Sequence, residues 1–234
     1  MIVLTPKARG WLVLSRLSNL PTIWTNVLAG AVVAGAAVDW TIAGAAAAVS
    51  LLYAGGMVLN DVCDAAHDRA HRSRRPIPAG VVTRSAAARG AVLLMLAGLL
   101  AVHALAPSGA ALAWSLGLVA AIAYYDMWHK RDPAAPLVMG VCRGLVYAVA
   151  AAAATGGVPS AVWPAAAVLT LYVAGFTVGA RYVPAARPWV SLCIAGISLV
   201  DAGALIVAGA PVTAALAAAG MPLTLLWQRW VPGD

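Results

Sequence analysis

Glutamate is absent from this 234-residue sequence, and all eight acidic residues are aspartates. Charged residues make up 10 % of the chain, whereas a soluble domain carries about a quarter. Hydrophobic residues make up 63 %, and the mean hydropathy is +0.89. This scarcity of charge excludes an ordinary soluble domain and predicts an integral membrane protein.

Cysteine is scarce as well. Cys63, Cys142 and Cys193 are unevenly spaced and lie inside or beside apolar runs. Such cysteines are typical of small buried side chains rather than of disulfide partners or metal ligands. The four histidines have no cysteine at a zinc-ligand spacing, so we do not expect a zinc site.

Long apolar runs fill most of the chain. A helix needs about 17 to 25 mostly apolar residues to cross a bilayer, and eight runs meet this requirement. The first is too long for the apolar region of a signal peptide, so we expect a retained span. The predicted fold is an all-α, polytopic transmembrane helix bundle in a single domain, 1–234. Its expected spans are 11–37, 41–62, 86–106, 109–127, 136–154, 160–180, 189–208 and 211–230.

Basic residues are unevenly distributed among the connections between these runs. Lysine and arginine occur before the first run, around the connections that follow the second, fourth and sixth, and near the end of the eighth. The alternate connections, 38–40, 107–108, 155–159 and 209–211, contain none. The positive-inside rule therefore predicts that the basic side, with both termini, is cytoplasmic. The net charge of +7 is expected to face anionic lipid rather than nucleic acid.

Residues 60–80, NDVCDAAHDRAHRSRRPIPAG, contain the densest group of charges. Asp61, Asp64 and Asp68 are spaced so that they lie on one face of a helix. Carboxylates gathered in this way need a cation, and Mg²⁺ commonly joins protein carboxylates to substrate phosphate oxygens. The arginines that follow are suited to bind phosphate. The segment therefore predicts a metal-bridged diphosphate site on the cytoplasmic face.

Three ionisable residues lie inside the expected spans, where charge is costly and usually faces the bundle interior. Arg16 could either line a cavity or extend to the membrane interface. Arg143 is flanked by Gly140 and Gly144 on the same helix face, which favours a tight internal surface and a cavity role. Asp201 could pair with an arginine or a hydroxyl, or be protonated, and is not assigned to the site.

The fourth run ends in Tyr125-Asp126-Met127-Trp128-His129-Lys130. Trp128 is expected to be an interfacial anchor. Lys130 shares the membrane face of the aspartates, so it could contact a diphosphate or simply add to the positive charge of that face.

The pattern NDxxDxxxD over residues 60–68, followed by RPIPAG over residues 75–80, resembles the first aspartate-rich motif of the UbiA superfamily of membrane prenyltransferases. Parts of the first run, the Tyr125 to Lys130 segment and residues 139–145 are also similar. The resemblance covers roughly residues 11–180 and is strongest to the branch found in ebo-type gene clusters.

The resemblance implies a helical bundle whose central cavity opens to the membrane. A polyprenyl diphosphate would be bound through Mg²⁺, and its prenyl group would pass to an acceptor small molecule or lipid. The implied metal ligands are Asn60, Asp61, Asp64 and Asp68, of which the three aspartates are also catalytic. The implied diphosphate-binding residues are Arg75, Lys130 and Arg181, and the implied substrate-binding residues are Arg16, Asn19, Tyr125 and Arg143.

The sequence departs from the family in two respects. The family's second acidic motif, at the end of the sixth run, is replaced by GARYVPAAR at 179–187, and the family usually has nine spans. Either Arg181 and Arg187 supply the charge of a second Mg²⁺, or catalysis is lost and the bundle binds or translocates a lipid or isoprenoid metabolite. The acceptor, the prenyl chain length and the oligomeric state stay open.

A second enzyme class, the CDP-alcohol phosphotransferases, uses a similar acidic cluster with the pattern DxxDGxxAR. Here Asp64 is followed by Ala65 instead of glycine, and the downstream acids of that pattern are missing. This sequence therefore favours the prenyltransferase interpretation.

Overall fold

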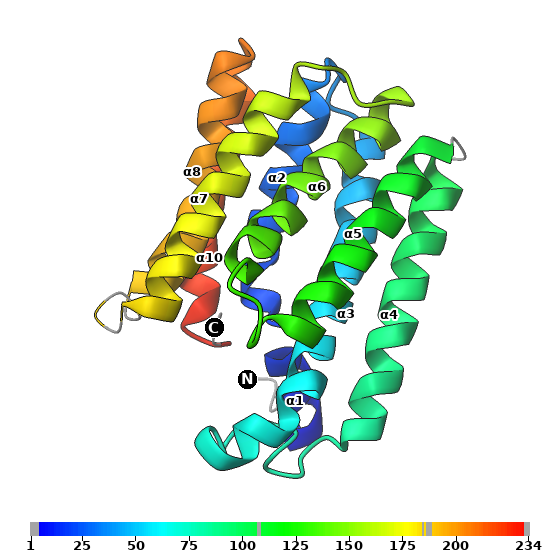
Figure 1. Ribbon diagram of the computed structural model, residues 1–234. Helices are drawn as coiled ribbons and strands as arrows, with labels where there is room; N and C mark the ends of the chain where they lie inside the picture. Colours follow the sequence, from blue (N-terminus) through cyan, green and yellow to red (C-terminus); the bar gives the residue numbers. More distant parts are fainter. Residues whose placement is uncertain (1–4, 107–108, 184, 186–188, 232–234) are drawn as a thin grey trace.

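The computed structural model describes residues 5–106, 109–183, 185 and 189–231, and every regular element in them is helical (Figure 1). The predicted all-α fold class is confirmed. Pro107, Ser108 and Arg187 lie outside the described residues. The elements are α1 (Pro6–Leu14), η1 (Leu17–Asn19), α2 (Leu20–Val33), α3 (Trp40–His71), α4 (Arg84–Leu105), α5 (Gly109–Trp128), α6 (Ala135–Thr155), α7 (Val162–Tyr182), α8 (Val190–Val207), α9 (Pro211–Ala218) and α10 (Gly220–Gln228).

Within the described residues, six helices, α3 to α8, are long and apolar enough to cross a membrane. The prediction of eight uninterrupted spans is not confirmed. The first expected run is interrupted near Arg16, whose φ is +46°, and α2 restarts just before Pro21. The last run is divided at Ala219, just before Pro222. Proline ends helices because it lacks a backbone N–H and its ring clashes with the preceding turn.

Helix α3 continues to His71 instead of ending at residue 62 as the sequence suggested. At 1.5 Å per residue its 32 residues span about 48 Å, more than the roughly 30 Å hydrocarbon core of a bilayer. The last turns of α3 therefore extend beyond the membrane core. Asp61, Asp64 and Asp68 lie on these turns, which confirms the helix predicted from their spacing.

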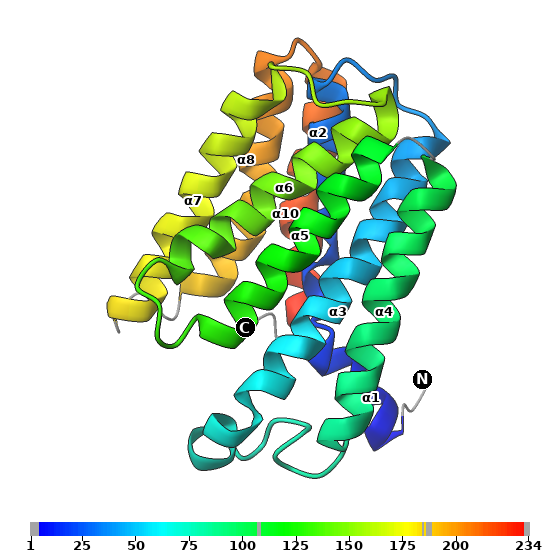
Figure 2. The same cartoon turned by 45° about the vertical axis from the view of Figure 1, so that its right-hand side comes forward.

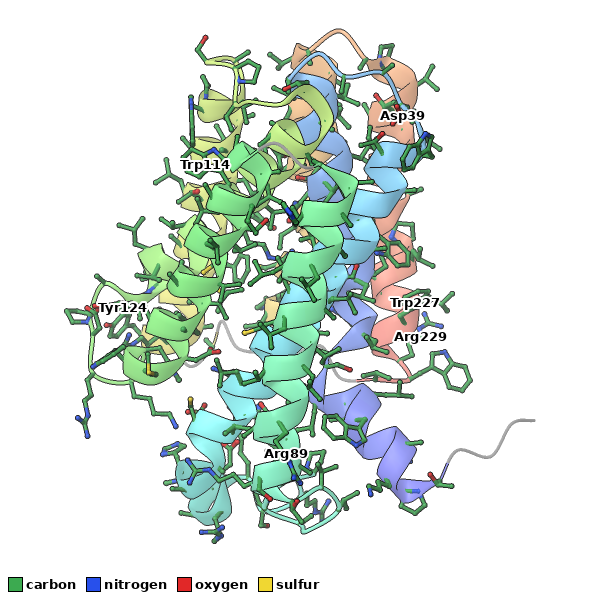
Figure 3. All side chains as sticks on the ribbon, turned by 90° about the vertical axis from the view of Figure 1, so that its right-hand side faces the viewer. Asp39, Arg89, Trp114, Tyr124, Trp227 and Arg229 are labelled. Carbon is green, nitrogen blue, oxygen red and sulfur yellow. The ribbon has the colours of Figure 1, made fainter. Side chains whose placement is uncertain are left out.

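Connecting segments gather at the two ends of the bundle. Figure 1 shows the end of α3 at the same lower end as the ends of α5 and α7. Side chains follow the same division in Figure 3, where Arg89 lies toward the lower end and Asp39 at the upper end. The basic connections predicted to share one face are therefore at one end of the bundle.

Helix α6 is the innermost helix. It packs against α2, α5 and α7 (Figures 1 and 2), and its residues 147–152 are fully buried. The outer helices α4, α5 and α7 instead expose large apolar side chains, among them Leu93, Leu116 and Leu171. An apolar exterior of this kind suits contact with lipid rather than water.

Glycines let α6 and α7 approach closely. A Cβ atom added at Gly140 would overlap the backbone carbonyl of Thr170, and one added at Gly144 would lie 2.5 Å from the Thr170 hydroxyl. Small residues at membrane helix interfaces allow this packing. The tight internal surface predicted on both sides of Arg143 is confirmed.

The interior contains a buried polar cluster across α2, α6 and α8. The Asp201 carboxylate accepts hydrogen bonds from Thr25 Oγ1 (2.6 Å), Tyr147 Oη (2.6 Å) and Asn26 Nδ2 (2.8 Å). Arg143 Nη1 donates to Asn26 Oδ1 at 3.0 Å. The Asn26 amide thus joins the buried guanidinium to the buried carboxylate. Of the partners that the sequence left open for Asp201, the structure shows hydroxyl groups, those of Thr25 and Tyr147.

Substitution Gly140→Ala should lower the free energy of unfolding of the detergent-solubilised protein by about 1–3 kcal/mol, and with it the melting midpoint. The added methyl group overlaps backbone atoms of α7 that cannot move aside. Gly117→Ala is the control, since no atom lies within 4 Å of a Cβ added there. Equal thermal melting midpoints for the two variants would contradict the packing argument.

Substitution Asp201→Leu should destabilise the fold by about 3–5 kcal/mol, since it leaves the buried Arg143 charge without its counter-charge. The double variant Asp201→Leu/Arg143→Met should recover much of this loss, because both charges are then gone. Thermal unfolding of the wild type, both single variants and the double variant measures the coupling. Additive losses would show that the two residues do not interact through Asn26.

Candidate active site

Two aspartates near the end of α3 share one cationic atom. Arg75 Nη1 is 3.0 Å from Asp61 Oδ1 and 3.0 Å from Asp68 Oδ2. Arg16 Nη2 lies 3.6 Å from the same Asp61 oxygen. Asp61 and Asp68 are 5 % and 2 % exposed. Because both carboxylates converge on a single nitrogen, the pair can share one cation.

The segment after α3 returns Arg75 to this position. Pro76 follows Arg75, and Gly80 has φ +73°, a left-handed conformation that favours glycine. Ile77 and Val82 are buried in an apolar cluster formed with α3 and α4. These contacts fix the turn, so the arginine of the RPIPAG sequence faces the aspartates.

Asp64 faces a different partner. It forms a salt bridge with Lys130, and His129 Nε2 lies 3.6 Å from its other oxygen. The interaction with the Asp64 carboxylate raises the pKa of His129, which favours the cationic imidazolium. The end of α5 therefore supplies the positive charge for Asp64, separately from Arg75.

Asn60 turns away from both groups. Its Nδ2 donates to Asp126 Oδ1 on α5 at 3.1 Å. Within the described part of the chain, no three His, Cys, Asp or Glu residues are grouped to hold a metal ion. The donor chemistry nevertheless fits Mg²⁺ at Asp61 and Asp68, since Mg²⁺ is usually bound through one or two carboxylates together with substrate phosphates.

Lys130 and Arg181 line one opening between the ends of α5 and α7, with a volume of about 600 Å³. Arg181 Nη1 donates to the backbone carbonyl of Asp132 at 2.8 Å. Arg181 lies at the end of α7, the position at which the resemblance implies a second acidic motif. A basic opening is present at that place.

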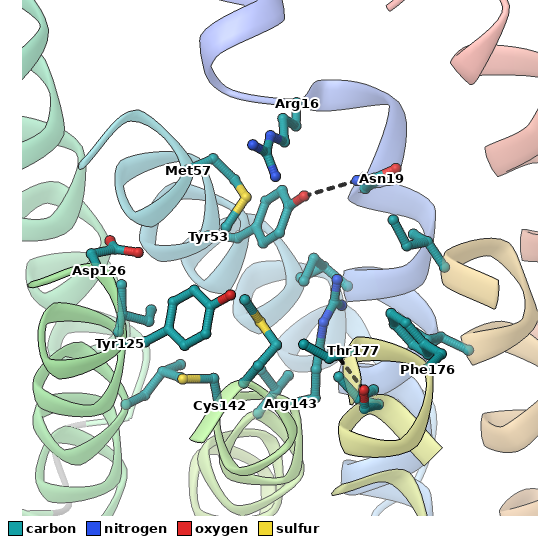
Figure 4. Close-up of a pocket in the computed structure, with 18 of the residues that line it drawn as sticks. Arg16, Asn19, Tyr53, Met57, Tyr125, Asp126, Cys142, Arg143, Phe176 and Thr177 are labelled. Atoms are coloured by element: carbon teal, nitrogen blue, oxygen red, sulfur yellow. Dashed lines mark hydrogen bonds between the residues drawn. The ribbon is translucent and has the colours of Figure 1, made fainter. Parts of the chain in front are cut away.

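A central cavity of about 210 Å³ adjoins this opening, since Tyr125, Thr177 and Ala180 line both. Most of its lining is apolar. The four residues predicted to bind substrate all line it: Arg16, Asn19, Tyr125 and Arg143 (Figure 4).

Tyr53 is a cavity residue that the sequence analysis missed. Asn19 Nδ2 donates to Tyr53 Oη at 3.2 Å, and the Arg143 guanidinium lies 5.4 Å from the centre of the Tyr53 ring (Figure 4). Its place on α3, seven residues before Asn60, puts both on the same helix face and was the available signal. Asp126, in the segment that ends α5, also lines the cavity, and its sequence context alone did not predict a role for it.

Comparison with known proteins extends these observations. The structure is similar to one of a membrane digeranylgeranylglyceryl phosphate synthase, with a TM-score of 0.63 and 15 % identity over 95 % of this chain and 96 % of that chain. It is also similar to the apo structure of a UbiA homologue from Aeropyrum pernix K1, with a TM-score of 0.63 and 22 % identity over 90 % of each chain. At these identities the likeness shows the fold.

No curated protein sequence matches this chain significantly. The suggested likeness to the ebo-type branch is not tested by these comparisons and stays a prediction. The sequence model of the UbiA prenyltransferase family matches residues 20–233, nearly the whole chain. With the helical bundle and its central cavity, this match shows that the chain belongs to the UbiA prenyltransferase family.

Proposed function

We propose that this protein is an integral-membrane prenyltransferase. It binds the head group of a polyprenyl diphosphate with Mg²⁺ at the end of α3 and transfers the prenyl group to an acceptor in the central cavity. The observation that carries the proposal is the convergence of Asp61 and Asp68 on one cationic atom, 3.0 Å from each.

Basic groups around the aspartates suit a diphosphate. Guanidinium and ammonium groups form strong, charge-assisted hydrogen bonds with phosphate oxygens. Arg75, now paired with Asp61 and Asp68, would turn to the diphosphate when these two carboxylates hold Mg²⁺. Lys130, paired with Asp64, would add positive charge from the end of α5. Bound Mg²⁺ would supply positive charge that stabilises the leaving diphosphate.

The cavity residues would act on the prenyl group and the acceptor. The allylic carbon–oxygen bond breaks with its electron pair going to the diphosphate. The acceptor then attacks the allylic cation and loses a proton, which the released diphosphate can take up. Apolar side chains such as Met57, Ile122 and Phe176 line the cavity and would exclude water. Asn19 and Arg143 provide the polar contacts that orient the acceptor.

The missing second acidic motif is compatible with this function. Arg181 and Lys130 share the opening beside the cavity and would supply positive charge in place of a second Mg²⁺. Arg187, which the sequence analysis paired with Arg181, lies outside the described residues. Since the basic connections lie at the end that contains the aspartates, we place that end and both termini in the cytoplasm.

Binding of a non-hydrolysable prenyl diphosphate analogue to the purified protein tests the proposal. We expect binding that depends on Mg²⁺ and that weakens at least about tenfold, or about 1.4 kcal/mol, in Asp61→Asn and Asp68→Asn. Asp39→Asn is the matched control, since Asp39 caps the opposite end of α3. Affinity that is independent of Mg²⁺ and unchanged in both variants would refute the diphosphate site.

A further inference from the structure

One buried carboxylate oxygen beside the central cavity has no partner among the described residues. Asp126 is 4 % exposed, and its Oδ1 accepts the hydrogen bond from Asn60. Its Oδ2 is buried and has no hydrogen-bond partner among the described residues. Buried polar atoms are nearly always paired, because leaving one unpaired costs its full desolvation energy. Among the described residues, no donor therefore serves the second oxygen of Asp126.

The position of Asp126 restricts what this donor can be. Asp126 lines the central cavity, and Figure 4 shows it on the side of Tyr125, opposite Phe176 and Thr177. Its partner Asn60 directly precedes Asp61 on α3. A group bound to Asp126 would thus lie inside the cavity and next to the start of the acidic face.

The surrounding side chains do not supply the donor. Met57, Ile122 and Cys142 line the same cavity and are apolar or weakly polar. The guanidinium of Arg16, also in the lining, is directed to Asp61 at 3.6 Å. A cavity ligand is therefore the natural source of the missing hydrogen bond.

We propose that Asp126 Oδ2 accepts a hydrogen bond from a hydroxyl or amine group of the prenyl acceptor, and that Asp126 therefore selects acceptors with an O–H or N–H group. This inference rests on the proposed function, because the acceptor is defined by prenyl transfer. A site with a buried hydrogen-bonding group rejects analogues that lack the matching group, since the protein atom then stays unpaired. Asp126 acts here as a specificity-determining residue.

A matched pair of probes tests this inference without diphosphate or Mg²⁺. The probes are 2-naphthol and 2-methoxynaphthalene, which differ in whether their oxygen has a hydrogen to donate. Binding is measured by isothermal titration calorimetry on the full-length protein in detergent. We expect wild-type protein to bind 2-naphthol at least about tenfold more tightly than its methyl ether.

Two variants separate recognition from folding. Asp126→Leu alone would leave the Asn60 amide unpaired, so the decisive variant is Asn60→Leu/Asp126→Leu, in which both partners are apolar. It should still bind the methyl ether but lose the preference for 2-naphthol. Leu116→Met, on the exposed outer face of α5, should keep the preference.

Two results would overturn the inference: equal affinities of the wild type for both probes, or a preference that survives in the double variant. A failure of the proposed prenyl-transfer function gives a different result from these two. If the diphosphate analogue does not bind but the 2-naphthol preference is present and lost in the double variant, the hydrogen-bonding site stands and the prenyl-transfer role is refuted.

Discussion

The arrangement of the acidic end of the bundle depends on one interaction, the shared contact of Asp61 and Asp68 with Arg75. Two carboxylates this close repel each other unless a cation lies between them, and burial strengthens the repulsion. The last turns of α3 provide the carboxylates, and the turn anchored by Ile77 and Val82 provides the cation. A diphosphate that brings its own Mg²⁺ would replace one cation by another without leaving the carboxylates uncompensated.

Charge within the membrane-spanning part follows the same principle. Arg143 lines the cavity, and its guanidinium donates hydrogen bonds to Thr22 and Asn26. The Asn26 amide in turn donates to the Asp201 carboxylate. Buried charges are costly in a membrane and persist where they serve a cavity and have partners. Supporting hydrogen bonds of this kind hold a binding group in one orientation before a ligand arrives. The polar cluster thus holds the Arg143 guanidinium in one orientation at the cavity wall.

Sequence patterns predicted the six spans α3 to α8, because the length of an apolar run is a local property of the sequence. They also predicted that the basic connections lie together at one end of the bundle. They did not predict the break at Arg16 or the extension of α3 to His71. Pro21 was a signal for the break, but the apolar run used to predict the span continues on both sides of this proline. Helical spacing placed the three aspartates on one face; it could not assign Arg75 to two of them and Lys130 to the third, since those pairings depend on how distant segments fold back. The unpaired oxygen of Asp126 likewise exists only in the packed bundle.

Mn²⁺ binding in the absence of any prenyl diphosphate tests whether Arg75 occupies the place of a divalent cation between Asp61 and Asp68. Electron paramagnetic resonance would compare the wild type with Arg75→Gln, and with Arg74→Gln as a control that removes an equal charge from an exposed neighbour. We expect tighter Mn²⁺ binding in Arg75→Gln alone, because the two carboxylates are then free to share the metal. Unchanged or weaker Mn²⁺ affinity in Arg75→Gln would contradict it.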